Sequence, residues 1–137
     1  GEVRLNLNAS EDLNTFAGVF VEDKFGAGVQ HLAFATDDIF ESANLLRVNG
    51  FKSLDIPSDY YEKTKKEFNL SDTFIAKLKK QNILYDQDGN GQYFQVYSKN
   101  LFDGFFFEIV QRKNGYPGYG ARNASVRLSS QTILQQA

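Results

Sequence analysis

The chain has 137 residues, 42% of them hydrophobic and with thirteen phenylalanines, which is the length and composition of one folded domain with an aromatic-rich core. Fifteen basic and seventeen acidic residues are spread along it, so no basic stripe indicates nucleic acid and no polybasic edge indicates a membrane surface. The lack of cysteine excludes disulfides, zinc fingers and thiol nucleophiles, and no apolar run is long enough for a membrane span or secretory signal, so we expect a cytoplasmic protein.

The N-terminal residues have strand-like patterns. Residues 3–8 alternate apolar and polar side chains, and residues 15–21 are a second strand candidate. We therefore expect residues 1–27 to hold the trailing strands and linker of a preceding, truncated module, whose remainder is a missing N-terminal part of the same chain. Such a strand would be an open sheet edge, and pairing between copies in a homo-oligomer is one way of covering it.

The only histidine lies in the next predicted strand, residues 29–35. Alternation places His31 on one face with Val29, Ala33 and Ala35, whose side chains are small or medium-sized. The imidazole therefore has open space beside it, as a metal or ligand requires. A histidine whose partners are all within the core is the commoner explanation of a lone one, and the pattern leaves both open.

A helix and a helical insertion follow. Asp38 can cap a helix whose apolar stripe is Ile39, Ala43 and Leu46. Residues 51–56 are typical of a strand, and residues 58–82 predict two short amphipathic helices that interrupt the sheet pattern.

Residues 83–85 and 92–98 predict a hairpin, and residues 105–112 predict the most apolar strand. With the insertion at about 58–82 removed, residues 28–112 form a β-α-β-β-β module with a curved, mostly antiparallel sheet. The fold class is therefore α+β. Residues 113–137 are a separate C-terminal segment.

The hairpin loop resembles half of a calcium site. Residues 86–91 have oxygen-bearing side chains and a glycine at EF-hand spacing, but the twelfth position is Tyr97 instead of a glutamate, and strands flank the loop. A hairpin turn with Asn90-Gly91 supplying the positive φ is the favoured interpretation.

Glu108 is an acid within an otherwise apolar strand. Burying a carboxylate there is costly unless a cation, a metal or several donors face it. A salt bridge to an internal arginine or lysine and ligation of a metal are equally consistent with the sequence. His31 and Glu108 alone do not complete a two-histidine-one-carboxylate iron site.

Among the amide side chains in predicted strands, Gln95 is the best candidate for a ligand contact because it shares a face with Tyr93 and Tyr97. No nucleophile elbow, phosphate-binding loop or dinucleotide fingerprint occurs, which removes the main support for hydrolase, kinase or dehydrogenase activity.

Six segments together resemble the C-terminal half of 4-hydroxyphenylpyruvate dioxygenase, in order and over essentially the whole chain. They are residues 26–33, 36–39, 56–61, 95–99, 107–112 and 118–120. This family belongs to the vicinal oxygen chelate superfamily, whose paired β-α-β-β-β modules form a half-open barrel around a metal. The resemblance implies an Fe(II) site, or one for another divalent metal, with His31 and Glu108 as two of three protein ligands. The third ligand, a histidine, would lie upstream of Gly1, so this fragment alone would be inactive.

The resemblance also implies a substrate pocket and a reaction. The matching substrate-binding positions are Asn8, Gln30, Gln95, Tyr119 and Asn123. The implied reaction is oxidative decarboxylation and hydroxylation of an aromatic α-keto acid with dioxygen. The partners would be this keto acid, or a related aromatic or cyclic acid, and dioxygen.

The C-terminal segment departs from the dioxygenase pattern. Ala124 stands where the family has a ring-stacking phenylalanine, and Arg122 stands where it has glycine. This ending looks more like the dioxygenase-like C-terminal domain of two-domain bacterial 3-dehydroshikimate dehydratases. The alternative function is therefore an accessory, metal-binding domain of such a dehydratase that is not itself an active dioxygenase.

Overall fold

The structure is a computed structural model that describes residues 3–7, 9, 11, 14–102 and 104–135. Asn8, one of the predicted substrate residues, lies outside the described residues. The helices and strands in chain order are α1 (Phe16–Asp23), β1 (His31–Ala35), α2 (Ile39–Val48), α3 (Ser58–Phe68), α4 (Asp72–Lys80), β2 (Leu84–Asp88), β3 (Gly91–Tyr97), β4 (Phe106–Lys113), the 3-10 turn η1 (Ala121–Asn123) and α5 (Ala124–Gln135).

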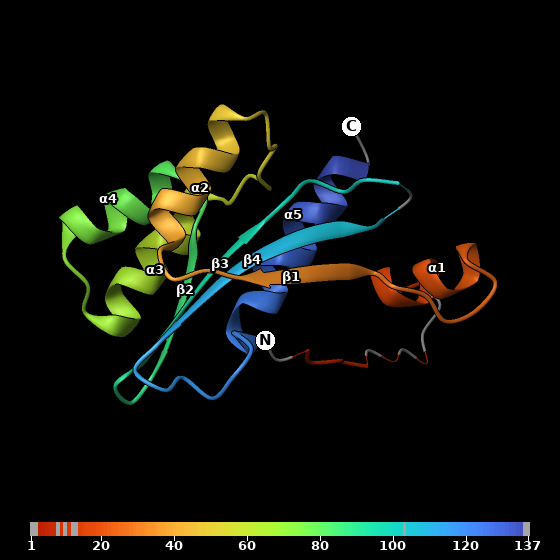
Figure 1. Cartoon of the computed structure of the whole chain (residues 1–137), viewed down its shortest axis with the longest axis horizontal. Coiled ribbons are helices and arrows are strands. Elements are labelled where there is room, and N and C mark those ends of the chain that lie inside the picture. Colours follow the sequence, from red (N-terminus) through yellow and green to blue (C-terminus); the bar gives the residue numbers. More distant parts are fainter. Residues whose placement is uncertain (1–2, 8, 10, 12–13, 103, 136–137) are drawn as a thin grey trace.

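The four strands form one open sheet in the order β1-β4-β3-β2. β1 runs parallel to β4, and the other two pairs are antiparallel. Helices and strands are therefore mixed around a mostly antiparallel sheet, which confirms the predicted α+β class. Figure 1 shows α2, α3 and α4 gathered at one side of the sheet, with α5 on the other side of β3 and β4.

The core lies between the sheet and α2 to α4. Phe94 of β3 contacts Phe40, Phe74 and Tyr85 through edge-on ring packing, with centroids 5.1 to 6.4 Å apart across the cluster. Because side chains alternate along a strand, the opposite face of β3 carries Tyr93, Gln95 and Tyr97, and that of β4 carries Phe106 and Glu108. The polar residues singled out in the sequence thus share the face away from these three helices.

The strand expected at residues 15–21 is wrong, because this segment is the helix α1. The Thr15 hydroxyl accepts a hydrogen bond from the Gly18 amide at 3.0 Å and caps the helix. Phe16 and Phe20, four residues apart, then fall on one helical face, so the apolar pattern has the helical period instead of the strand period. Residues 3–7 form no strand either, and Val3, Leu5 and Leu7 are exposed.

The strand expected at residues 51–56 is reduced to one isolated bridge between Ser53 and Ser98. The Leu54 amide donates to the Tyr97 carbonyl at 2.7 Å, but the Ile56 amide donates to the Asn82 side chain instead of a strand. The chain leaves the sheet there because Pro57 begins the turn into α3. The helices α3 and α4 lie within the insertion expected at 58–82.

Residues 86–91 form the β2–β3 hairpin, although Gly89 supplies the positive φ, +56°, in place of the expected Asn90-Gly91 pair. Gly91 has a different role, since a Cβ there would lie 2.8 Å from the Tyr116 Cα. The Asp86 carboxylate accepts from the Tyr116 hydroxyl and the Gln87 amide.

The division of the chain into residues 1–27, 28–112 and 113–137 stays a prediction. Of the helices in the described part of the chain, none is long and apolar enough to cross a membrane.

Candidate metal centre

His31 and Glu108 meet on the face of the sheet opposite α2 to α4 because β1 and β4 are parallel neighbours. His31 is paired with Phe106, and Glu108 is paired with Ala33. The small Ala33 leaves room in front of the carboxylate, and the His31 Nε2 atom lies 3.7 Å from the Glu108 Oε2 atom. The strand pairing therefore brings together two residues that are 77 positions apart in the sequence.

The Glu108 carboxylate is buried, with 6% of the residue exposed. Its Oε1 atom accepts a hydrogen bond from the Gln95 amide at 2.8 Å. Its Oε2 atom faces His31, which is the partner of Glu108 in the ion pairs of the described residues. The internal salt bridge weighed in the sequence is therefore not formed within the described part of the chain.

The His31 ring is held flat against Phe106, with ring centroids 4.9 Å apart and planes 4° apart. Burial lowers the pKa of His31 below its usual value; the Glu108 carboxylate opposes this shift and the positive charge of Arg127 adds to it. A lowered pKa favours the neutral imidazole, whose free nitrogen lone pair can bind a metal.

A chain of hydrogen bonds runs from Glu108 back into the fold. The Asn123 Nδ2 atom donates to the Gln95 Oε1 atom at 2.7 Å, and the Tyr60 hydroxyl lies 2.9 Å from the Asn123 Oδ1 atom. An ionised carboxylate can only accept hydrogen bonds, so the amide nitrogen of Gln95 must face Glu108. The orientation of Gln95 then fixes the direction of the hydrogen bonds from Asn123 and Tyr60. We call Tyr60, Asn123, Gln95 and Glu108 the amide relay.

Tyr60 anchors the amide relay to the sheet edge. Its hydroxyl accepts from the Tyr85 amide at 2.7 Å and lies 3.0 Å from the Tyr85 carbonyl. Burial raises the pKa of Tyr60 to about 12, so the hydroxyl keeps its proton and remains a donor at neutral pH. The helical insertion, through α3, thus supports the carboxylate of Glu108.

A cavity of about 640 Å³ opens in front of His31 and Glu108. Its other lining residues are Arg4, Asn6, Ala33, Ala35, Thr36, Asp37, Tyr93, Tyr97, Phe106, Val110, Arg112, Tyr119, Gly120, Ala121, Ala124 and Arg127. Burial first, and then the negative charge of Glu108, raise the pKa values of Tyr93 and Tyr97, so both phenols stay protonated.

The predicted substrate residues are only partly at this cavity. Tyr119 lines it and is 49% exposed, so its ring is available for stacking. Gln95 and Asn123 lie behind the wall, buried and bonded to each other. Gln30 does not line the cavity, and its amide nitrogen is buried with no partner in the described part of the chain.

Tyr60 and Arg127 are the site residues that the sequence did not single out. Tyr60 lies in the segment 56–61 that carries the family resemblance, which was the one available signal. Arg127 follows an irregular stretch, so its position relative to the sheet had no sequence signal.

The His31 and Glu108 side chains fit a divalent metal. Nitrogen and oxygen ligands lie about 2.1 Å from such an ion, so one ion can bond two atoms that are 3.7 Å apart. The Glu108 Oε2 atom faces His31 and would gain a cation. In the described part of the chain, no third side chain of a ligand type (histidine, cysteine, aspartate or glutamate) joins His31 and Glu108. The remaining ligands of the metal would therefore come from elsewhere.

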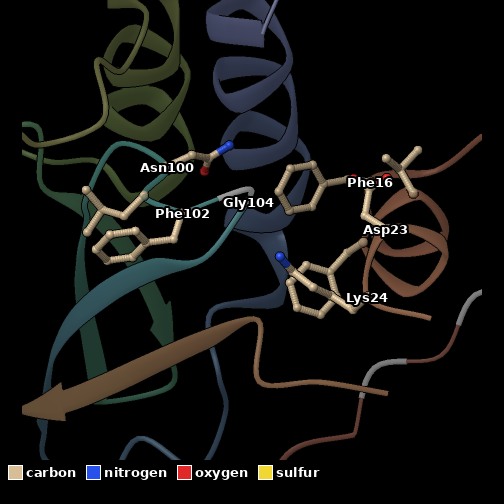
Figure 2. A pocket seen from close by; sticks show the side chains of 9 residues that line it. Phe16, Asp23, Lys24, Asn100, Phe102 and Gly104 are labelled. Carbon is tan, nitrogen blue, oxygen red and sulfur yellow. The ribbon is translucent and has the colours of Figure 1, made fainter. Parts of the chain in front are cut away.

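A second cavity, of about 580 Å³, lies between α1 and residues 100–102 and 104. Figure 2 shows Phe16 of α1 directed towards Gly104, with Asp23 and Lys24 at the rim and Phe102 on the far side. Its walls are mainly aromatic and aliphatic, and it contains none of the predicted ligands. The polar groups capable of chemistry converge at the first cavity.

The chain is similar to proteins with different names. The chain is 43% identical over 131 residues to a 3-dehydroshikimate dehydratase of Pseudomonas putida, covering 95% of this chain and 21% of the dehydratase. It is 35% identical over 126 residues to a 4-hydroxyphenylpyruvate dioxygenase of Legionella pneumophila, covering 90% of this chain and 36% of the dioxygenase. No protein-family model matches the chain.

Two solved structures are similar to the chain. A fusion protein of a xylose isomerase-like TIM barrel and a 4-hydroxyphenylpyruvate dioxygenase superposes with a TM-score of 0.75 at 44% identity, over 78% of this chain and 17% of that one. A mutant of 4-hydroxymandelate synthase from Streptomyces coelicolor gives a TM-score of 0.72 at 30% identity, over 88% of this chain and 34% of the synthase chain. The resemblance inferred from the sequence is confirmed, and the chain spans about a fifth of the dehydratases and a third of the dioxygenases that it matches.

Removing the Tyr60 hydroxyl tests the amide relay. Tyr60→Phe leaves the Tyr85 amide and the Asn123 oxygen without their partner, so we expect a loss of about 1–3 kcal/mol in the free energy of unfolding, measured with urea. Tyr61→Phe is the matched control, because the Tyr61 hydroxyl is buried with no partner in the described part of the chain. Equal destabilisation by both variants would contradict the relay.

Adding a methyl group to Gly120 tests how tightly the C-terminal segment is packed on Gln95. A Cβ at Gly120, where φ is +65°, would lie 2.4 Å from the Gln95 Oε1 atom. Gly120→Ala should cost about 1–3 kcal/mol more than Gly115→Ala, since Gly115 has a similar φ of +73° but open space around its Cβ position. Chemical denaturation compares the two, and equal losses would show that backbone conformation alone decides the cost.

Proposed function

We propose that this chain is the C-terminal, metal-binding region of a 4-hydroxyphenylpyruvate dioxygenase-like non-haem Fe(II) oxygenase. The observation that carries the proposal is the buried Glu108 carboxylate, whose ion-pair partner in the described part of the chain is the His31 imidazole at 3.7 Å. A buried carboxylate without a cation is costly, and a metal ion in front of it removes that cost. Another divalent metal could take the same place.

The ligand set fits the two-histidine-one-carboxylate arrangement of non-haem iron oxygenases. His31 and Glu108 would supply one histidine and the carboxylate. A second histidine would come from an upstream module of the same chain. When bound, Fe(II) supplies a centre that can coordinate an α-keto acid and dioxygen together and exchange electrons with them.

The residues of the chain would position the metal ligands and the substrate. Gln95 holds the Glu108 Oε1 atom and leaves the Oε2 atom directed at the open cavity. Tyr119, half exposed at the wall, would stack on the substrate ring. Gln30 and Asn8 stay predicted substrate contacts, whereas the bonds of Gln95 and Asn123 favour a supporting role for these two.

The reaction we propose is the oxidative decarboxylation and hydroxylation of an aromatic α-keto acid, with that acid and dioxygen as the small-molecule partners. Cytoplasmic localisation and a homo-oligomer stay predictions.

A second candidate function is an accessory, metal-binding domain of a two-domain 3-dehydroshikimate dehydratase without dioxygenase activity of its own. Two observations favour it. The identity to the dehydratase, 43%, exceeds the 35% to the dioxygenase. Ala124 also lines the cavity where the dioxygenase resemblance expects a ring-stacking phenylalanine.

Metal content of the protein at its full natural length tests the ligand assignment common to both functions. His31→Ala and Glu108→Gln each remove one ligand, so we expect the bound metal, measured by mass spectrometry after dialysis, to fall about tenfold or more. Asp59→Asn is a control, because the exposed Asp59 pairs only with Lys63 at the surface. Metal content equal to wild type in both ligand variants would disprove the assignment.

Oxygen uptake separates the two functions. The iron-loaded protein given 4-hydroxyphenylpyruvate should consume dioxygen and release carbon dioxide in equal amounts if it is a dioxygenase, and His31→Ala should abolish both. Stoichiometric iron with no oxygen consumption would contradict dioxygenase activity on this substrate and favour the accessory domain.

A further inference from the structure

Arginine side chains are among the residues that line the metal-centre cavity. Arg112, on β4, and Arg127, in the first turn of α5, both line it together with Arg4. The lining carboxylates are Glu108, which faces His31, and Asp37. With a divalent cation at His31 and Glu108, positive charge would exceed negative charge in this space.

Arg127 is fixed in position by its neighbours. Its guanidinium lies 5.2 Å from the ring centroid of Phe106, the ring that stacks on His31, and 5.7 Å from that of Tyr97. Its Nη1 atom donates to the Oε1 atom of the fully buried Gln131 at 2.8 Å. A guanidinium held this way loses little conformational entropy when it binds a ligand.

The two guanidinium groups have neutral partners. The Arg112 Nε and Nη2 atoms donate to the Gly118 carbonyl at 3.3 and 3.1 Å, and its guanidinium lies 4.5 Å from the Tyr93 ring centroid. In the described part of the chain, no carboxylate lies within ion-pair distance of Arg112 or Arg127. Arg127 donates to Gln131 from Nη1, and its guanidinium carries further N–H groups, on Nε and Nη2, that a ligand could accept from.

Space is available beside Arg127. Ala124 precedes it by three residues on α5, so the two lie on the same helical face, and both line the cavity. The methyl group of Ala124 leaves room where a large side chain would block access to the guanidinium. The planar N–H donors of a guanidinium match the two oxygens of a carboxylate better than they match the single hydroxyl of a phenol.

We propose that Arg127 binds a carboxylate on the substrate that is separate from its metal-chelating keto-acid group. The preferred substrate is therefore an α-keto acid that carries a second carboxylate on its ring or chain. This inference rests on the proposed metal centre for the placement of the keto-acid end. It makes Arg127 the residue that selects an acidic over a phenolic ring.

Calorimetric titration of the protein at its full natural length tests the inference, with metal bound and without oxygen. The probes are 4-carboxyphenylpyruvate and 4-hydroxyphenylpyruvate, which differ only in the ring substituent. We expect the wild-type protein to bind the carboxylated acid about tenfold or more tightly, because a charge-assisted hydrogen bond replaces a neutral one.

The variants separate charge from shape. Arg127→Leu should remove the preference by weakening 4-carboxyphenylpyruvate about tenfold or more while changing 4-hydroxyphenylpyruvate less than about threefold. Arg127→Lys should retain part of the preference, since the charge stays and the planar fork is lost. Arg122→Leu is the control, because Arg122 pairs with Glu67 outside this cavity, and melting temperatures verify that each variant folds.

Three outcomes would overturn the inference: equal wild-type affinity for the two acids, binding of neither, or a preference that survives Arg127→Leu. Stronger competition by inorganic phosphate than by benzoate would show a phosphate site instead. Titration of benzoate and phenol against the metal-free protein separates failure of the arginine site from failure of the metal centre. A benzoate preference lost in Arg127→Leu supports the arginine site even where no metal binds.

Discussion

The buried carboxylate of Glu108 is the constraint on which the site depends. It lies within an apolar strand, accepts a hydrogen bond from Gln95 and has His31 as its ion-pair partner in the described part of the chain. An uncompensated charge in this position would destabilise the fold. The parallel pairing of β1 with β4 brings the imidazole of His31 in front of the Glu108 Oε2 atom. We propose that a metal ion between the two satisfies both groups.

The rest of the domain is arranged to hold this carboxylate in one orientation. The amide relay joins it to the C-terminal segment through Asn123 and to the helical insertion through Tyr60. Gly120 allows the C-terminal segment to approach Gln95 more closely than any residue with a Cβ could. Segments far apart in the chain therefore cooperate in one hydrogen-bond network, which gives the insertion a function beyond packing.

The sequence predicted what depends on local pattern. The α+β class, the Asp38 helix cap and the histidine face of β1 followed from periodicity and capping. The short apolar run of residues 15–21 fits the period of a strand and that of a helix, so the sequence alone did not distinguish them. The hydrogen bond from the Gly18 amide to the Thr15 side chain favours the helix. The supporting roles of Gln95 and Asn123 depend on which way each amide faces, which only distant partners fix. The position of Arg127 at the cavity depends on the path of the irregular residues 114–120 that precede it, and this path has no periodic signal in the sequence.

The most direct test of the metal centre is a crystal structure of the protein at its full natural length, grown with Fe(II) without oxygen and measured at the iron absorption edge. We predict one anomalous peak within about 2.0–2.2 Å of both the His31 Nε2 and the Glu108 Oε2 atoms. A Glu108 carboxylate paired with an arginine or lysine from outside the described residues, and no peak beside His31, would contradict the metal centre.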